Sequence, residues 1–155
     1  MKKNSHILLG MLTALTFNVP LTACVIGSLS PDIDVKWTKN QSSLLSAHRG
    51  ITHHLIVALF LIFFSFVLEN EWIKGFIYGY LSHLFGDLMT KTGIPYWKHK
   101  DRLALKIFKT GSIEEYIFVY SLIVVIFAVL FLTSGYTAFI PFEVQSFLNI
   151  QFPHP

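Results

Sequence analysis

The predicted fold depends most on one apolar stretch, GFIYGYLSHLFGDLMT, which covers residues 75–90. Four of its residues recur at every fourth position and so share one slowly turning stripe of a helix: Gly75, Gly79, His83 and Asp87. The two glycines form a surface on which a neighbouring helix can lie close. The imidazole and the carboxylate are one turn apart and point the same way, so together they could hold one cation.

Composition places the chain among integral membrane proteins. Of its 155 residues, 53% are hydrophobic and only 14% are charged, against roughly 25% in an ordinary soluble domain. The formal net charge of +3 is too small to indicate a nucleic-acid partner. Cys24 is the only cysteine, so any metal must be held by His and carboxylate side chains.

Four apolar segments lie along the sequence: residues 7–29, 51–68, 72–89 and 116–142. A helix needs about 20 apolar residues to cross a bilayer, and the fourth segment meets that length without a charge. The second and third do so if their polar residues sit near one membrane surface or face the interior of a bundle. We therefore predict an all-α integral membrane helical bundle with three to four transmembrane helices. Residues 1–142 would form its single domain and residues 143–155 a short tail.

Basic residues gather in the loops on one side of these segments. All but one of the 12 Lys and Arg residues fall at the start, between the first and second segments, or between the third and fourth. The link between the second and third segments instead holds Glu69, Glu71 and only Lys74. The positive-inside rule places the basic loops in the cytoplasm. We expect a multi-pass protein of the bacterial inner (cytoplasmic) membrane.

The first apolar segment is interrupted by Asn18 and Pro20. A single span there would put the N-terminal lysines outside, against the charge rule, whereas two short pieces could enter and return as a re-entrant hairpin. A competing interpretation is a lipoprotein signal peptide, because the sequence LTAC ends at Cys24. Cleavage there would place both basic loops outside, so the hairpin is the preferred prediction.

Ionisable side chains converge on the cytoplasmic face in this topology, because the second segment enters the membrane where the third leaves it. The convergent groups are Asp32, Asp34, His48, His53, His83 and Asp87, with His6 added if the first segment re-enters. Ionisable groups in membrane segments are costly and usually functional, so a metal site is one interpretation. Surface residues and helix caps are the alternative. A structural cap also fits Ser112 and Glu115, which have capping-box spacing at the start of the fourth helix.

Four motifs follow one another along the chain: GSLSPDID (27–34), HRGITHHL (48–55), GYLSHLFGDLMTKTGIPY (79–96) and TGSIEEY (110–116). In that order they resemble the YdjM-like family of LexA-regulated inner-membrane proteins, which are described as metal-dependent hydrolases. The N-terminal SHILLG, residues 5–10, is similar to the family's opening Thr-His-x-x-x-Gly. The resemblance extends over about residues 5–120.

This resemblance implies a divalent metal site that serves hydrolysis, with zinc as the expected ion. Carried over position by position, the implied ligands are His6, Asp32, His53, His83 and Asp87. Asp34, His48, Arg49 and Glu115 would lie close by. The sequence departs from the family pattern at Val35, where the family has His, and at His54, where it has Ser. His54 is the candidate to compensate for the ligand missing at Val35.

The leading hypothesis is a membrane-bound metal-dependent hydrolase. A water activated by the metal would be the nucleophile, Asp34 or Asp32 the general base, and Arg49 the group that stabilises developing negative charge. A site at the level of the lipid headgroups favours a lipid-like or phosphoester substrate, with membrane lipid as the partner. The main alternative is a non-catalytic protein whose cluster binds or transports a metal ion or protons. A structural or interaction role for the same residues is the third.

Overall fold

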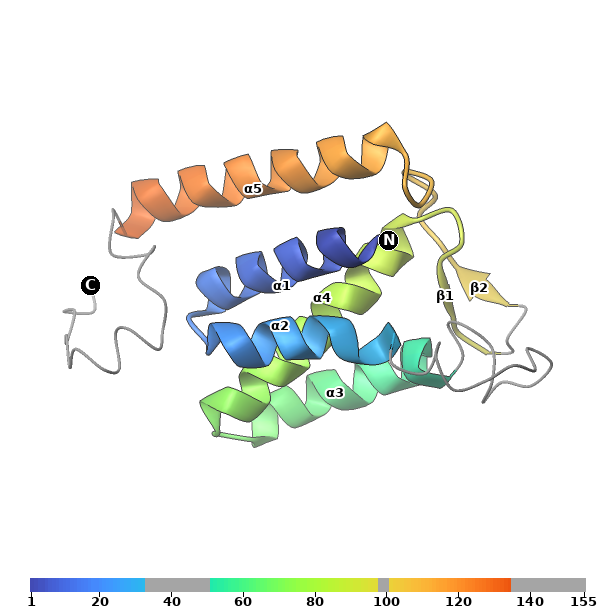
Figure 1. The fold of residues 1–155 in the computed structure, drawn as a ribbon. Coiled ribbons are helices and arrows are strands. Elements are labelled where there is room, and N and C mark those ends of the chain that lie inside the picture. Colours follow the sequence, from blue (N-terminus) through green and yellow to red (C-terminus); the bar gives the residue numbers. More distant parts are fainter. Residues whose placement is uncertain (33–50, 98–100, 135–155) are drawn as a thin grey trace.

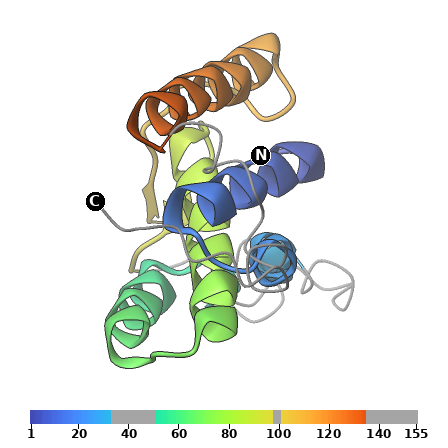
Figure 2. The ribbon, with the colours of Figure 1, turned by 90° about the vertical axis from the view of Figure 1, so that its left-hand side faces the viewer.

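Five α-helices and two short strands make up the part of the chain that the computed structural model describes, which covers residues 1–32, 51–97 and 101–134 (Figure 1). In chain order the elements are α1 (Lys3–Phe17), α2 (Leu21–Leu29), the short 3-10 helix η2 (Ile51–His53), α3 (Leu55–Val67), α4 (Glu71–Met89), β1 (Ile94–Pro95), β2 (Arg102–Leu103) and α5 (Ile113–Ser134). α4 contacts α1, α2 and α3, and α5 packs on α1 (Figure 2). α4 is therefore the element around which the other helices are placed.

The break predicted in the first apolar segment is confirmed. α1 ends where Asn18 adopts a left-handed conformation (φ 49°), and the Asn18 N–H donates to the carbonyl of Ala14. Pro20 has no N–H to leave unpaired, and it stands just before the first residue of α2. α1 and α2 then pack against each other as a hairpin. The entry of this hairpin into a membrane stays a prediction.

Glycines allow α2 and α4 to lie in close contact. A side chain on Gly79 would collide with the backbone carbonyl of Cys24, and one on Gly27 would collide with a backbone carbonyl of α4. At Gly75 an added Cβ would meet the Cβ of Ala23 at 3.2 Å. The predicted glycine surface of α4 is therefore confirmed, and the helix that lies on it is α2.

α3 and α4 form a second hairpin. His54 is the N-cap of α3, where its ring accepts a hydrogen bond from the N–H of Ile56 (3.3 Å). Asn70 caps α4 by accepting from the N–H groups two and three residues further on (2.9 and 3.2 Å). Because the link between the two helices is short, the start of α3 and the end of α4 lie at the same end of the molecule (Figure 1).

The segment between α4 and α5 folds back on the end of α4. Its two strands pair antiparallel, with Ile94 opposite Leu103, and Gly93 permits the turn into β1 with a φ of 64°. Phe108 from this segment is buried at 1% exposure against Met89 of α4. The all-α prediction is therefore right for the helices and incomplete for this connection, which contains a two-stranded ladder.

One helix of the described residues, α5, is long and apolar enough to cross a membrane, over Ile113–Thr133. Only 6% of its apolar window is buried inside the structure, so most of its surface is available to a bilayer. α3 is apolar but has only 13 residues, fewer than the usual span of about 20. The prediction of three to four spans is thus supported for α5 and stays a prediction for the other helices.

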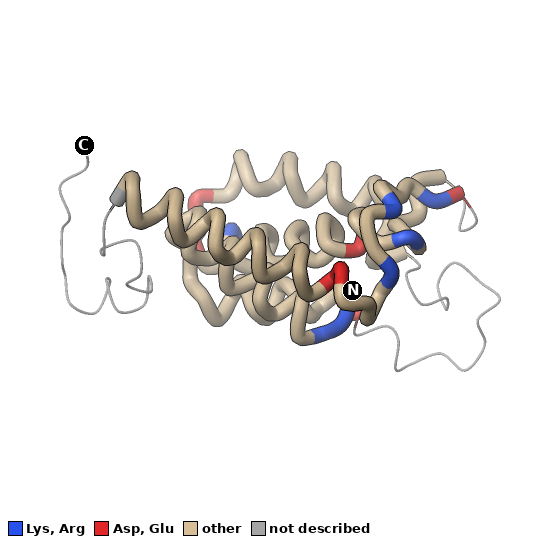
Figure 3. Tube along the Cα trace, turned by 90° about the horizontal axis from the view of Figure 1, so that it is seen from above, with Lys and Arg blue, Asp and Glu red and all other residues tan. Residues whose placement is uncertain are grey.

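Lys and Arg residues gather at one end of the molecule (Figure 3). This basic end holds the N-terminus, the end of α4 and the start of α5. At the opposite end, where α4 begins, Lys74 is paired with Glu71 at 2.9 Å. The asymmetry follows the distribution of charge between the loops in the sequence, and the candidate site lies at the basic end.

Candidate metal site

The structure brings together all five side chains that were predicted as metal ligands. They come from α1, from the residues after α2, from η2 and from α4, and they are His6, Asp32, His53, His83 and Asp87. Three further predicted site residues, Asp34, His48 and Arg49, lie outside the described residues, so their roles stay predictions.

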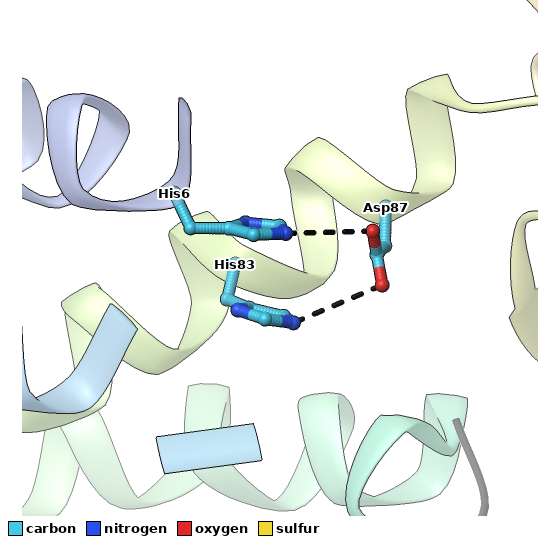
Figure 4. A group of neighbouring side chains, drawn as sticks. All are labelled: His6, His83 and Asp87. Carbon is cyan, nitrogen blue, oxygen red and sulfur yellow. Dashed lines mark ion pairs between the residues drawn. The ribbon is translucent and has the colours of Figure 1, made fainter. Parts of the chain in front are cut away.

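His6, His83 and Asp87 form the first group of donor atoms (Figure 4). Oδ1 of Asp87 is 3.6 Å from Nε2 of His6, and Oδ2 of Asp87 is 3.7 Å from Nε2 of His83. The two imidazoles are stacked, with ring centroids 3.6 Å apart and planes inclined by 10°. Both rings therefore present Nε2 to the same carboxylate.

His83 also belongs to a second group, which adds Asp32 and His53. Oδ1 of Asp32 lies 3.7 Å from Nε2 of His53 and 3.7 Å from Nε2 of His83. Nε2 of His53 is 3.0 Å from Nε2 of His83 and 3.6 Å from Oδ2 of Asp87. His83 therefore belongs to both groups, and because one imidazole nitrogen has one lone pair, it can ligate an ion in only one of them at a time unless both groups share that ion.

Hydrogen bonds from outside the cluster fix the orientation of two imidazoles. Nδ1 of His83 lies 2.7 Å from the carbonyl oxygen of Ser28, and because a carbonyl only accepts, Nδ1 carries the proton. The Thr52 hydroxyl lies within hydrogen-bond distance of the carbonyl of Pro31 (3.2 Å) and of Nδ1 of His53 (3.0 Å); when its proton is donated to the carbonyl, it accepts from Nδ1. Each ring then presents an unprotonated Nε2 to the site, as metal-bound His residues do.

With the protons on Nδ1, the two Nε2 atoms form an unfavourable contact, which a bound cation would remove. The unprotonated Nε2 atoms of His53 and His83 are 3.0 Å apart, and their lone pairs repel unless a proton or a cation lies between them. A tetrahedral zinc ion with nitrogen ligands at roughly 2.0–2.1 Å holds two of them about 3.3 Å apart. The distances of 3.0–3.7 Å between donor atoms of the cluster bracket that value.

Four of the five donor side chains are closed to solvent, and one of them already accepts a positive group. The side chains of His53 and His83 are 0% exposed, and those of His6 and Asp87 are 1% exposed. A buried carboxylate costs on the order of several kcal/mol unless it is paired. Here Asp87 accepts a hydrogen bond from the α-amino group of Met1, a cation standing beside the His ligands. The residues present therefore fit a positively charged ion.

Asp32 is the donor nearest to solvent, with 16% of its side chain exposed. Burial acts to raise the pKa of its carboxyl, but when the surrounding imidazoles are protonated, the hydrogen bond from His53 and the positive charges of the rings lower that pKa to about 2. The carboxylate is therefore ionised at neutral pH and contributes a full negative charge to the site.

Sequence reasoning did not find the groups that support the ligands. The carbonyl of Ser28 belongs to the backbone, and a residue pattern carries no signal for it. Thr52 stands directly before His53 in the motif HRGITHHL, which was the one available sign of its role. His54 was the candidate to replace the ligand missing at Val35, and this is wrong: it caps α3, and its Nε2 lies 3.3 Å from a backbone carbonyl at Trp97.

Glu115 does not form the capping box that its spacing from Ser112 predicted. The N–H of Ser112, which such a box would use, donates to a backbone carbonyl three residues earlier. The fully buried Glu115 carboxylate instead accepts from the N–H of Gly111 (2.7 Å), the N–H of Lys2 (2.8 Å) and the hydroxyl of Ser5 (2.5 Å). It thereby ties the start of α5 to the start of α1, the helix that carries the first imidazole of the cluster.

Comparison with known proteins identifies the family of the chain. The model of one family, the YdjM inner membrane protein family, matches residues 1–140. Two curated relatives, the inner membrane protein YdjM of Escherichia coli (strain K12) and that of Shigella flexneri, are each 30% identical over 116 residues. The match covers 61% of this chain and 59% of each relative. No solved structure matches the chain. The chain belongs to the YdjM inner membrane protein family.

Proposed function

We propose that this member of the YdjM inner membrane protein family is a metal-dependent hydrolase of the bacterial inner membrane. The observation that carries the proposal is the pair of overlapping donor groups, which share His83 and together contain three buried imidazoles, one buried carboxylate and the partly exposed carboxylate of Asp32. The names of the relatives support the inner membrane as its location, and α5 supports insertion. Because the match spans about three fifths of each relative's length, the proposed activity rests on the cluster itself.

Zinc is the ion that the donor set favours. Imidazole nitrogens with carboxylate oxygens suit Zn²⁺, whereas Ca²⁺ and Mg²⁺ prefer sites made of oxygen alone. Such an ion supplies a Lewis acid that activates water and polarises a phosphoryl oxygen. The chain's own contribution is to orient the imidazoles of His53 and His83 through their Nδ1 atoms and to exclude solvent from all three rings.

We assign the general base and the group that stabilises negative charge to the segment between Asp32 and η2. Asp32 is already a member of the donor cluster, so we assign the general base to Asp34, two residues further on. Arg49 is assigned to the stabilisation of developing negative charge. Both flank described residues at the site, because the hydroxyl of Thr52 donates to the carbonyl of Pro31 and so joins the two ends of the segment.

The proposed substrate is a lipid-like molecule or a phosphoester at the membrane surface. The cluster lies at the end of the bundle where Lys and Arg gather (Figure 3). Basic groups at a cytoplasmic membrane surface attract anionic headgroups, each contributing about 1 kcal/mol. A membrane lipid is accordingly the partner we propose.

Transport of an ion or of protons through the same cluster has less support. On α4 the stripe that carries Asp87 and His83 continues as Gly79 and Gly75, and both glycines pack against α2. Between His83 and the first turn of α4, this stripe therefore offers no polar side chain. A transport route needs ionisable groups along its length, so the geometry favours hydrolysis at the basic end of the bundle over transport across it.

Turnover by the purified, reconstituted protein tests the proposal. The two probes are soluble bis(p-nitrophenyl) phosphate and a fluorescent phosphatidylglycerol in vesicles. We expect hydrolysis of at least one probe, loss of that hydrolysis on chelation, and its return with Zn²⁺. Asp87→Ala should abolish turnover, whereas Arg49→Ala should lower turnover and leave the metal content unchanged.

His54→Ala is the matched control, because His54 caps α3 and lies outside the cluster. It should keep both the metal and the turnover. Hydrolysis that persists after chelation and in Asp87→Ala would contradict the proposal, as would a metal-loaded protein that turns over neither probe.

A further inference from the structure

A cavity of about 550 Å³ lies between α1, α3, α4 and α5. Its lining includes Leu9, Leu12 and Phe17 of α1, Phe66 of α3, Leu81 and Phe85 of α4, and Leu122 and Ile126 of α5. This volume falls within the range of roughly 300–1,000 Å³ that is usual for ligand sites. The cavity is separate from the cluster of donor atoms, which does not contribute to its lining.

The four serine and threonine hydroxyls in the lining are engaged within their own helices, and the phenol of Tyr78 is the other hydroxyl there. Thr13 and Thr16 each donate to a carbonyl four residues earlier in α1 (2.8 Å for both). Ser65 of α3 and Ser82 of α4 each donate to a carbonyl three residues earlier (2.7 Å for both). The cavity therefore presents hydrocarbon to an occupant, and a polar ligand would find few partners in it.

One end of the cavity adjoins the candidate metal site. Leu9 lies one turn after His6 on α1, and a Cβ added to Gly86 would meet both Leu9 (3.0 Å) and His6 (3.4 Å). Ser82 directly precedes His83 in α4, and Phe85 follows His83 by two residues. From Leu9 to Phe17 the cavity follows α1 for eight residues, which is about 12 Å at 1.5 Å per residue.

The other end of the cavity reaches the surface. Phe66 and Phe17, which line this end, are 86% and 59% exposed. The helix that closes one side is α5, whose apolar window is only 6% buried within the protein. For a chain inserted through α5, the medium at this opening is the hydrocarbon of the bilayer.

We propose that this cavity binds an acyl chain of the lipid substrate while the phosphoester lies at the cluster of donor atoms. This proposal rests on the proposed function and names its substrate class: a membrane phospholipid rather than a soluble phosphoester. Three features support an acyl chain as the occupant. They are the hydrocarbon lining, the opening toward the bilayer and the junction with the site at Leu9.

Photo-crosslinking tests the proposal directly. The full chain is reconstituted in phosphatidylethanolamine–phosphatidylglycerol vesicles with a trace of phosphatidylglycerol that carries a diazirine in mid-chain, and the labelled residues are mapped by peptide mass spectrometry. We expect labels inside the cavity, at Leu12 and Leu81, in addition to labels on the outer face of α5. Labels confined to outer surfaces would overturn the proposal, whether the cavity is empty or filled by protein.

A pair of variants on α5 separates cavity binding from contact with bulk lipid. Ile126→Trp fills the cavity, whereas Val125→Trp adds the same bulk at a residue that is 56% exposed and outside the lining. Interior labelling should fall about tenfold in Ile126→Trp, as when two methylene groups lose their apolar site, and should stay unchanged in Val125→Trp. Equal interior labelling in both variants would also overturn the proposal.

Failure of the proposed function gives a different result. Asp87→Ala lacks the central carboxylate of the cluster but leaves the lining of the cavity intact, so it should lose metal and turnover and keep interior labelling. If the wild-type protein shows interior labels but no turnover, the result would support the acyl-chain cavity and would contradict only the proposed hydrolase activity. Turnover without interior labels would keep the hydrolase and overturn the cavity's role.

Discussion

At the scale of single residues, the imidazoles of His53 and His83 are held by groups that lie outside the cluster. The Ser28 carbonyl and the Thr52 hydroxyl each accept a hydrogen bond from an Nδ1–H, which leaves the Nε2 lone pairs of the two rings facing each other at 3.0 Å. Supporting hydrogen bonds of this kind set the tautomer of a metal-binding His and raise its basicity. The cluster is thus prepared for a cation by residues that do not ligate one.

Removal of the Thr52 hydroxyl should weaken metal binding without removing a ligand. Thr52→Val keeps the shape of the side chain but frees His53 to place its proton on Nε2, so we expect metal affinity to fall roughly 10- to 100-fold. Titration of the purified protein against a chelator of known affinity measures the change. Thr52→Ser retains the hydroxyl and should keep wild-type affinity; a Val variant that binds as tightly as the Ser variant would contradict this role.

The five donor residues could be predicted from the sequence because topology and motif order both point to them. Asp32, His53, His83 and Asp87 stand at segment ends that must share one membrane face, and the structure brings their side chains together. The supporting carbonyl of Ser28 could not be predicted, because every residue has a carbonyl and only the packing of α2 on α4 selects this one.

At the scale of elements, the contact between α2 and α4 positions the site. The spacing of Gly75 and Gly79 indicated a close helix neighbour, but the sequence did not say which helix it would be. Gly27 identifies α2, since its missing side chain makes room for the backbone of α4. Ser28 follows Gly27 directly, so the same close approach brings the Ser28 carbonyl to His83.

A substitution that pushes α2 away from α4 should weaken metal binding, although the substituted residue is not a ligand. In Gly79→Ala the new methyl group would collide with the rigid backbone of α2, so we expect a loss of roughly 1–3 kcal/mol in stability, as for other overpacked contacts. Thermal unfolding in detergent measures the loss, and metal analysis should show reduced affinity because the Ser28 carbonyl is displaced.

Gly75→Ala is the graded comparison for that variant. Its Cβ would meet the methyl group of Ala23 and the carbonyl oxygen of Pro20, each at 3.2 Å, whereas a Cβ on Gly79 would lie far closer to the carbonyl oxygen of Cys24. A smaller loss of stability and little change in metal affinity are therefore expected for Gly75→Ala. Equal effects at the two positions would show that the glycine contact does not position the site.

The elements after α4 were the least predictable. The pairing of Ile94 with Leu103 joins two-residue strands, too short to leave an alternating pattern in the sequence. Glu115 stood at capping-box spacing, yet its carboxylate is used by the start of α1, a partner more than a hundred residues away. Local rules locate the start of α5 correctly but do not reveal which distant group the carboxylate binds.

At the scale of the whole molecule, the two ends of the bundle differ in charge. The basic end carries the cluster, and the opposite end carries the link between α3 and α4 (Figure 3). Apolar periodicity and loop charge predicted this polarity from the sequence. They did not predict how short α3 would be, because the length of a helix depends on its caps at His54 and Leu68.

Labelling of single cysteines from either side of the membrane tests this orientation. Lys109→Cys, at the basic end, should react with an impermeant maleimide only from the cytoplasmic side, and Asn70→Cys only from the periplasmic side. The native Cys24 is fully buried and serves as the unlabelled background. Periplasmic labelling at Lys109→Cys would reverse the assigned face, and labelling of both positions from one side would exclude a span between them.

The central claim is that His6, Asp32, His53, His83 and Asp87 form one metal site, and metal analysis of the detergent-purified protein tests it most directly. The shared Nε2 of His83 leads us to expect about one ion per chain in wild type and in His54→Ala. His83→Ala and Asp87→Ala should each lose most of that ion. Absence of metal from the wild type, or equal content in all four proteins, would contradict the account.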